Sequence, residues 1–180
     1  MKQYFRECDE RISPPDAFRY VIPQRAISIT EQVLRAYGGR RRTSEGLVYW
    51  GGAKDGNTVR VLTVIAPQTT SAPRRVVATN TANARVVNEL VDHRFVYLAQ
   101  IHSHPGDWVD HSDGDDEWAA FKHDGLLSLV VPDYGRGGML PLAKCGVHRY
   151  QGGEFKRFSD EYVENHFELS ELEIQFFDLR

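Results

Sequence analysis

The chain has 180 residues, 41% of them hydrophobic and 26% charged, which are ordinary values for one globular domain with a buried core. Its net charge of -3 excludes an overall electrostatic attraction to nucleic acid. The two cysteines, Cys8 and Cys145, have no CxxC spacing, which argues against a disulfide framework or a thiolate zinc site and suits a reducing compartment. The N-terminus lacks the apolar core of a signal peptide, and no apolar run approaches the ~20 residues of a membrane span, so we expect a cytoplasmic protein without a membrane partner.

The first half of the chain is predicted to alternate between helices and strands. Residues 1–24 contain three of the prolines and are expected to be an extended lead-in, and the basic triplet at 40–42 is expected to be a solvated turn. After the lead-in, the pattern predicts a helix over 27–37, strands over 45–50 and 59–66 separated by a turn at 51–57, a Pro-, Thr- and Ser-rich loop at 67–78, and a helix over 81–92.

The second half begins with a run of apolar residues that predicts a buried strand. The elements expected here are that strand over 95–101, a polar loop, a helix over 112–123, strands over 126–132 and 142–149 joined by a glycine-rich link, and an acidic tail from Asp160 that forms a helix and a short strand. No GxGxxG or GKS motif occurs, so a phosphate-binding loop is not expected. This order of elements predicts a single mixed α/β domain.

Two histidines at the end of the 95–101 strand carry the strongest chemical signal. His102 and His104 are two residues apart, so on a strand their imidazoles lie on one face and can converge on one ion. Pro105 then ends the strand, and Asp115 falls in the first turn of the next predicted helix, where it can fold back as a third ligand. Two imidazoles and one carboxylate are typical of catalytic zinc, which keeps its fourth position for water. Glu45, at the start of an apolar strand, is the best-placed carboxylate to serve as the base.

Other interpretations of this acidic stretch are weaker. Ser112 and Asp115 also form a pattern typical of a helix N-cap with an acid three residues on, which is compatible with a metal site. A calcium loop counted from Asp110 fails, because its sixth position is Asp115 where an EF-hand needs glycine. Four further side chains are potential ligands that we rank lower: His111, Asp113, Asp116 and His123.

The segment resembles a known family. His102-Ser103-His104-Pro105, six further residues, and Ser112-Asp113-Gly114-Asp115, with Glu45 upstream, match the motif of JAB/MPN-domain (JAMM) zinc metalloproteases. The segments 45–51 (EGLVYWG) and 128–135 (SLVVPDYG) are similar to the family's glutamate strand and to the strand after its metal helix. The resemblance covers about residues 25–150.

The resemblance implies a fold and a role for each motif residue. The fold would be a JAB/MPN-like (cytidine-deaminase-like) α/β domain with a central mixed sheet flanked by helices, spanning 25–158 between a lead-in at 1–24 and an extension at 159–180 that packs on or extends it. His102, His104 and Asp115 would bind one catalytic zinc ion. Glu45 would be the general acid and base, and Ser112 would donate a hydrogen bond to the oxyanion, typically worth ~2.7–4 kcal/mol of barrier.

The expected activity is cleavage after the C-terminus of a ubiquitin-like protein, which removes it from conjugates or matures its precursor. The short 67–80 loop favours a bacterial-type enzyme. The resemblance implies a role in a bacterial ubiquitin-like modification system, a class that includes antiviral systems. Activating-like and conjugating-like proteins of the same operon would be its partners. Two alternatives stay open: a peptidase that processes a sulfur-carrier protein in thiol or cofactor biosynthesis, and a non-catalytic MPN interaction module, against which the intact motif argues.

Overall fold

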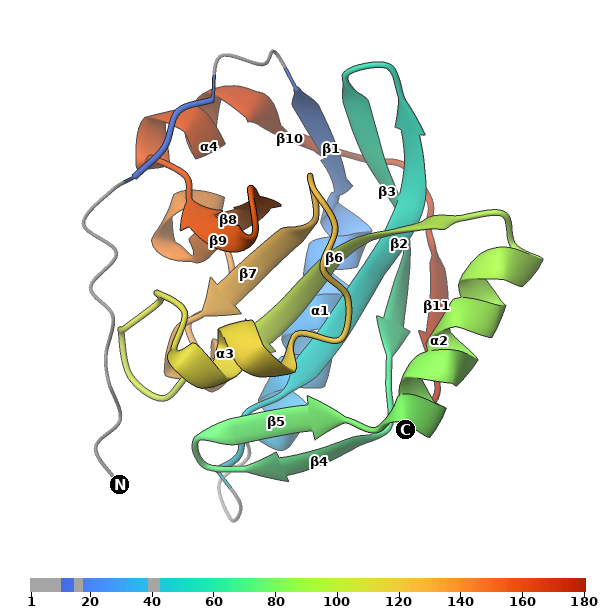
Figure 1. Cartoon of the computed structure of the whole chain (residues 1–180), viewed down its shortest axis with the longest axis vertical. Helices are drawn as coiled ribbons and strands as arrows, with labels where there is room; N and C mark the ends of the chain where they lie inside the picture. Colours follow the sequence, from blue (N-terminus) through green and yellow to red (C-terminus); the bar gives the residue numbers. More distant parts are fainter. Residues whose placement is uncertain (1–10, 15–17, 39–42) are drawn as a thin grey trace.

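This computed structural model describes residues 11–14, 18–38 and 43–180, and one curled mixed β-sheet dominates them (Figure 1). Its strands, in spatial order, are β10 (Phe167–Ser170), β1 (Arg19–Pro23), β3 (Thr58–Ala66), β2 (Leu47–Asp55), β6 (Val96–Ser103), β7 (Leu127–Val131), β8 (Gly146–Gln151) and β9 (Glu154–Arg157), with β11 (Gln175–Asp178) also paired with β3. Strand β6 lies between antiparallel β2 and parallel β7. The carboxyl end of β6 is therefore held on both sides.

Helices cover the sheet, and a small hairpin stands apart from it. The helices are α1 (Gln24–Tyr37), α2 (Asn80–Asp92), α3 (Asp113–Trp118) and α4 (Asp160–His166), and the hairpin joins β4 (Thr69–Ala72) to β5 (Arg75–Ala78). Figure 1 shows α1 behind the sheet, with α3 and the hairpin in front of it. Hairpin and α3 therefore lie on the same side of the sheet, near the end of β6.

Strand β2 has a hydrophobic core on both of its faces. Trp50 belongs to the large cluster beneath α1, and its indole N–H donates a 2.8 Å hydrogen bond to Thr30 Oγ1. Tyr49 points the other way, into a smaller cluster with Leu90 of α2. Burial of both faces explains why β2 begins as an uninterrupted apolar run rather than an alternating one.

The mixed α/β class is confirmed, and the predicted positions of α1, α2, β3, β6 and β7 agree with the structure to within a few residues. The turn predicted over 51–57 is confined to Gly56 and Asn57, because β2 continues to Asp55. Gly51 and Gly52 form a bulge instead, and a Cβ on Gly52 would lie 1.9 Å from the carbonyl oxygen of Arg60. Glycine is needed there for close approach of two strands and not for a reversal.

The predicted loop at 67–78 is wrong. These residues form the β4–β5 hairpin, in which Thr69 pairs with Ala78 and Ala72 pairs with Arg75. The hairpin is tied to the sheet by the Glu45 backbone N–H, which donates to the carbonyl oxygen of Ala72 over 3.0 Å. Its β-branched residues outweigh the loop-forming prolines and serines.

The predicted helix over 112–123 is too long, since α3 ends at Trp118 and Ala119, with a ψ of 120°, is no longer helical. Beyond it, the ring of half-buried Phe121 packs 4.3 Å from that of Tyr97, so the chain after the helix turns back to place an aromatic side chain against β6. The strand predicted over 142–149 begins only at Gly146. Leu142–Lys144 form a 3-10 turn, closed by the Cys145 N–H donating to the carbonyl oxygen of Leu142.

Both ends of the described chain contribute to the sheet. Arg19–Pro23, within the expected lead-in, form β1, and the tail supplies α4 as predicted and then two strands, where one was expected. Cys145 is buried with a free thiol, while Cys8 and the triplet Arg40-Arg41-Arg42 lie outside the described residues. Among the residues described, no helix has the length and apolar character needed to cross a membrane.

Candidate metal centre and cleft

Two imidazoles converge at the carboxyl end of β6. His102 is near the end of the strand and His104 follows it, so both side chains lie on one face of the sheet. Their Nε2 atoms are 3.1 Å apart, and each residue is only 4% exposed. The His104 N–H donates to the carbonyl oxygen of Val131, 2.9 Å away, and Tyr134 N–H donates to that of His104, 2.8 Å away. The sheet therefore holds this pair rigidly.

The third group of the predicted site comes from α3. Ser112 is the N-cap of this helix and Asp115 the third residue after it, and they form a reciprocal capping box, which confirms the capping pattern predicted from the sequence. Asp115 Oδ2 accepts hydrogen bonds from the Ser112 N–H and hydroxyl, both 2.7 Å long. Asp115 oxygens lie 3.3 Å from His102 Nε2 and 3.2 Å from His104 Nε2. Within the described ranges these three residues are the one group of this kind, with ligand atoms all within 4.8 Å of one another.

The spacing and chemistry of these donors fit a tetrahedral zinc ion. Zinc bonds of ~2.0–2.2 Å at tetrahedral angles place neighbouring ligand atoms about 3.4 Å apart, close to the separations found here. His104 Nδ1 lies 3.3 Å from the carbonyl oxygen of Trp108, which can only accept, so Nδ1 carries the proton and Nε2 presents its lone pair. The Trp108 indole stacks on the same imidazole and fixes its orientation, with ring centroids 5.0 Å apart.

The electrostatics of His102, His104 and Asp115 favour a positive charge at the point where the three side chains converge. Burial opposes protonation of His102, but Asp115 and Glu45 outweigh it and raise the pKa of this imidazole. Burial lowers the pKa of His104, assisted by His102. Burial would raise the pKa of Asp115, but the two histidines hold it well below its usual range. The carboxylate is therefore ionised, and a single cation would satisfy all three groups.

Glu45 lies two residues before β2, the neighbouring strand, and its carboxyl interacts electrostatically with His102 and Asp115. Leu47 pairs with His102, and this register extended by two residues puts Glu45 opposite His104. The extension is supported by Gly46, whose N–H donates to Ser103 Oγ over 3.0 Å and whose carbonyl oxygen accepts from the Ser103 N–H over 3.1 Å. Glu45 is 4% exposed, and burial raises the pKa of its carboxyl to about 8. Such a group exchanges protons readily near neutral pH.

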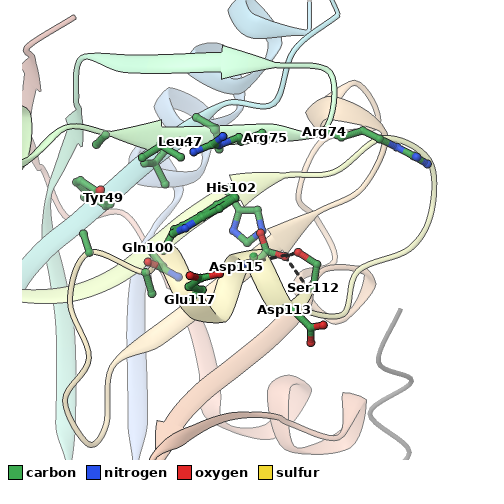
Figure 2. Close-up of a pocket in the computed structure, with 17 residues that line it drawn as sticks. Leu47, Tyr49, Arg74, Arg75, Gln100, His102, Ser112, Asp113, Asp115 and Glu117 are labelled. Carbon is green, nitrogen blue, oxygen red and sulfur yellow. Dashed lines mark hydrogen bonds and ion pairs between the residues drawn. The ribbon is translucent and has the colours of Figure 1, made fainter. Parts of the chain in front are cut away.

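A cleft of about 530 Å³ leads to this centre. Figure 2 shows His102 and Asp115 between the hairpin strand that carries Arg75 and the helix that carries Glu117. Leu47 and Tyr49 of β2, with Gln100 and His102 of β6, line the cleft together with residues of β5 and α3. The guanidinium of Arg75 lies 4.1 Å from the ring centroid of Trp118, so this contact joins the two walls.

The structure brings the three predicted ligands together and places Ser112 and Glu45 beside them. The lower-ranked candidates His111, Asp113, Asp116 and His123 do not join the group. Arg74 and Arg75, the cleft residues of the hairpin, were not among the predicted site residues. The available signal was the β-branched residues on each side of Pro73 and Arg74, which is typical of two strands around a turn.

Comparisons with known proteins bear on the fold and on the family. No protein-family model matches the chain. The solution structure of protein DSY2949 from Desulfitobacterium hafniense has a similar fold, with a TM-score of 0.61 at 17% identity, over 86% of this chain and 94% of that one. A curated protein of Sinorhizobium fredii, named probable metalloprotease y4jG, is 34% identical over 125 residues, which cover 67% of this chain and 75% of the relative. A metalloprotease implies a metal ion, which the His102, His104 and Asp115 group could hold. The chain belongs to the metalloprotease family of this Sinorhizobium fredii protein.

Proposed function

We propose that this protein is a zinc-dependent peptidase of the JAB/JAMM type that cuts the amide bond after the C-terminus of a ubiquitin-like protein. It would remove the modifier from conjugates or mature its precursor in a bacterial modification system. One observation carries this proposal: His102, His104 and Asp115 converge beside the buried carboxyl of Glu45 at the end of a cleft. Three ligands and a separate acid-base group are what metal-assisted amide hydrolysis requires.

His102, His104 and Asp115 would hold the zinc ion through two Nε2 atoms and one carboxylate. Bound there, zinc would polarise the scissile carbonyl and make water more acidic. Glu45 takes the proton from the attacking water as the new carbon–oxygen bond forms. It then passes this proton to the leaving nitrogen as the carbon–nitrogen bond breaks, so that Glu45 ends the cycle as it began. The raised pKa of its carboxyl, about 8, suits both steps.

Ser112 is positioned to stabilise the negative charge that develops on the carbonyl oxygen. Its hydroxyl donates to Asp115 Oδ2 over 2.7 Å and accepts from the Asp115 N–H over 3.3 Å. Rotation of the hydroxyl hydrogen away from Asp115 would direct it toward the oxyanion. The capping box keeps the oxygen in place while the hydrogen turns.

The substrate tail would lie extended in the cleft, along β5. Among the described residues β5 pairs with β4 alone, and Val76, Val77 and Ala78 line the cleft, so the second edge of β5 is open to strand addition. The contact between Arg75 and Trp118 narrows the cleft. A tail that passes this contact must carry small residues next to the scissile bond.

A processing assay tests the proposal. A small ubiquitin-like protein is fused through its C-terminus to an unrelated protein and incubated with the zinc-loaded enzyme. We expect cleavage at the modifier's own C-terminus, which stops with a chelator, returns with zinc, and fails when its penultimate small residue is replaced by a bulky one. The double variant His102→Ala, His104→Ala is the control and should be inactive. An intact fusion with fully zinc-loaded enzyme would show that the substrate class is wrong.

A further inference from the structure

His111 is buried beside the metal centre, but both of its ring nitrogens are occupied. Nδ1 lies 2.7 Å from Asp116 Oδ1, and Nε2 lies 2.8 Å from Ser128 Oγ. The Asp116 carboxylate can only accept, so Nδ1 donates and Nε2 of the neutral imidazole accepts from the Ser128 hydroxyl. Ser128 in turn accepts a 3.2 Å hydrogen bond from the side-chain amide of Gln100. A continuous chain of hydrogen bonds therefore runs from β6, through β7 and His111, to α3.

This chain of hydrogen bonds spans the first turn of α3. His111 immediately precedes the N-cap Ser112, and Asp116 is the fourth residue after the cap. These are the two positions that a hydrophobic staple joins in other helices, and here a polar contact joins them. It therefore encloses Ser112 and Asp115, both of which lie between His111 and Asp116.

Apart from the contact of Trp118 with Arg75 of the hairpin, helix α3 packs weakly on the rest of the protein. It has six residues and none of them is buried, so neither its length nor its packing makes it stable on its own. Asp110, the residue before His111, is fixed by an ion pair with Arg157 over 2.8 Å. The His111 side chain adds a second attachment, from the sheet to the helix itself. Its contact with the sheet is buried, since Ser128 is 0% exposed.

The imidazole of His111 also packs against the metal centre itself. Its ring centroid lies 5.8 Å from that of His102, and His148 and Phe155 confine it on other sides at 4.3 Å and 4.7 Å. Because the ring is confined in this way and is hydrogen-bonded to both elements, it fixes the position of α3 relative to the sheet. A metal site needs its ligands held to within about 0.5 Å, which the capping box alone cannot do relative to the sheet.

We propose that His111 is a positioning residue that locks α3 onto the sheet, and so sets Asp115 and Ser112 at the correct distance from His102 and His104. The proposal rests on the proposed function for the roles of these four residues. His111 binds neither metal nor substrate. It acts through Asp116 on the helix and through Ser128 on β7.

Zinc affinity of the metal-free protein is the decisive measurement, made by competition with a chromogenic chelator. His111→Ala should weaken zinc binding by about 10–100-fold, the usual effect of losing a residue that orients metal ligands. Ser128→Ala removes only the hydrogen bond between His111 and the sheet and should give a smaller loss of zinc affinity. Because both changes break the same connection, Ser128→Ala should add nothing in the His111→Ala background. The control is His123→Ala, at an exposed histidine outside the cleft, which should bind zinc as the wild type does.

Two further readouts separate positioning from a general loss of stability. At saturating zinc, His111→Ala should lower kcat while KM stays within about twofold, because the cleft walls remain. His111→Asn, whose amide can occupy the place of Nδ1 and bind Asp116, should recover part of the zinc affinity. If His111→Ala does not fold, Ser128→Ala decides: weakened affinity supports the proposal and wild-type affinity overturns it.

Wild-type zinc affinity and kcat in a folded His111→Ala protein would also overturn it, as would additive effects of the two alanines. Zinc affinity is measured without substrate, so an error in the proposed substrate class would leave this result unchanged. Zinc binding that persists in the His102→Ala, His104→Ala protein would instead refute the proposed metal centre, whatever His111 does.

Discussion

Replacement of Glu45 by glutamine should lower activity and, in the metal-free protein at high pH, raise stability. Burial raises the pKa of the Glu45 carboxyl from 4.5 to about 8. A raised carboxyl pKa contributes stability below pH 4.5, and this contribution is lost as pH rises through 8. At ~1.4 kcal/mol for each tenfold change in ionisation constant, ionising Glu45 at pH 9 costs at most about 5 kcal/mol. Because the neighbouring cleft admits water, we expect the Glu45→Gln protein to gain about 2 kcal/mol over the wild type between pH 5 and pH 9.

The assay is denaturant unfolding of both proteins, without metal, at these two pH values. Glu154→Gln is the control, because Glu154 is exposed on β9 and its ion pair with Lys156 is solvent-exposed, so its replacement should change stability by less than about 1 kcal/mol and leave activity unchanged. With zinc restored, Glu45→Gln should bind metal normally and lose about 10²–10⁴-fold in kcat, the usual contribution of a general acid-base group. Equal stability of the two proteins at both pH values would refute the argument from burial. Undiminished turnover by the zinc-loaded variant would remove Glu45 from the mechanism.

Three further predictions follow from the site and its surroundings. Purified protein should hold about one zinc per chain, and His102→Ala or His104→Ala should lose most of it; full occupancy of the double variant by elemental analysis would place the ligands elsewhere. Ser112→Ala should retain zinc but slow peptide cleavage by ~10²–10³-fold, and an unchanged rate would exclude the hydroxyl as an oxyanion donor. Burial, assisted by His111, lowers the pKa of His148 to about 4, so its neutral ring contributes stability above pH 6.5 that is lost as pH falls toward 4. The metal-free His148→Asn protein should therefore lose up to about 3 kcal/mol less than the wild type over this range in denaturant unfolding, and parallel losses would contradict the assignment.

The grouping of the metal-site residues could be predicted because its relations are local. His102 and His104 share a face by the two-residue period of a strand, and Ser112 and Asp115 meet across one helical turn. The contact between His111 and Asp116 could not be predicted from the sequence in the same way. Both could be ranked only as spare ligands, because their partner Ser128 lies on a strand whose register with β6 is a long-range property.

The cleft could not be predicted from the sequence, because part of its lining comes from residues 67–78, whose structure was predicted wrongly. Residues 67–78 combine loop-forming prolines with β-branched residues, and only pairing with a partner strand decides between loop and hairpin. The early end of α3 has a similar origin, since the contact of Phe121 with Tyr97 joins segments that are separate in the sequence.

The sequence by itself determined the donor set for a metal, the positions of α1, α2, β3, β6 and β7, and the mixed α/β class, since each follows from residue type and short-range periodicity. Only the tertiary structure decided that the Glu45 carboxyl interacts with His102 and Asp115, that it is buried enough to have a pKa of about 8, and that β5 and α3 enclose a cleft. Strand register, burial and the packing of a helix without buried residues depend on contacts between distant segments, which residue order along the chain does not specify.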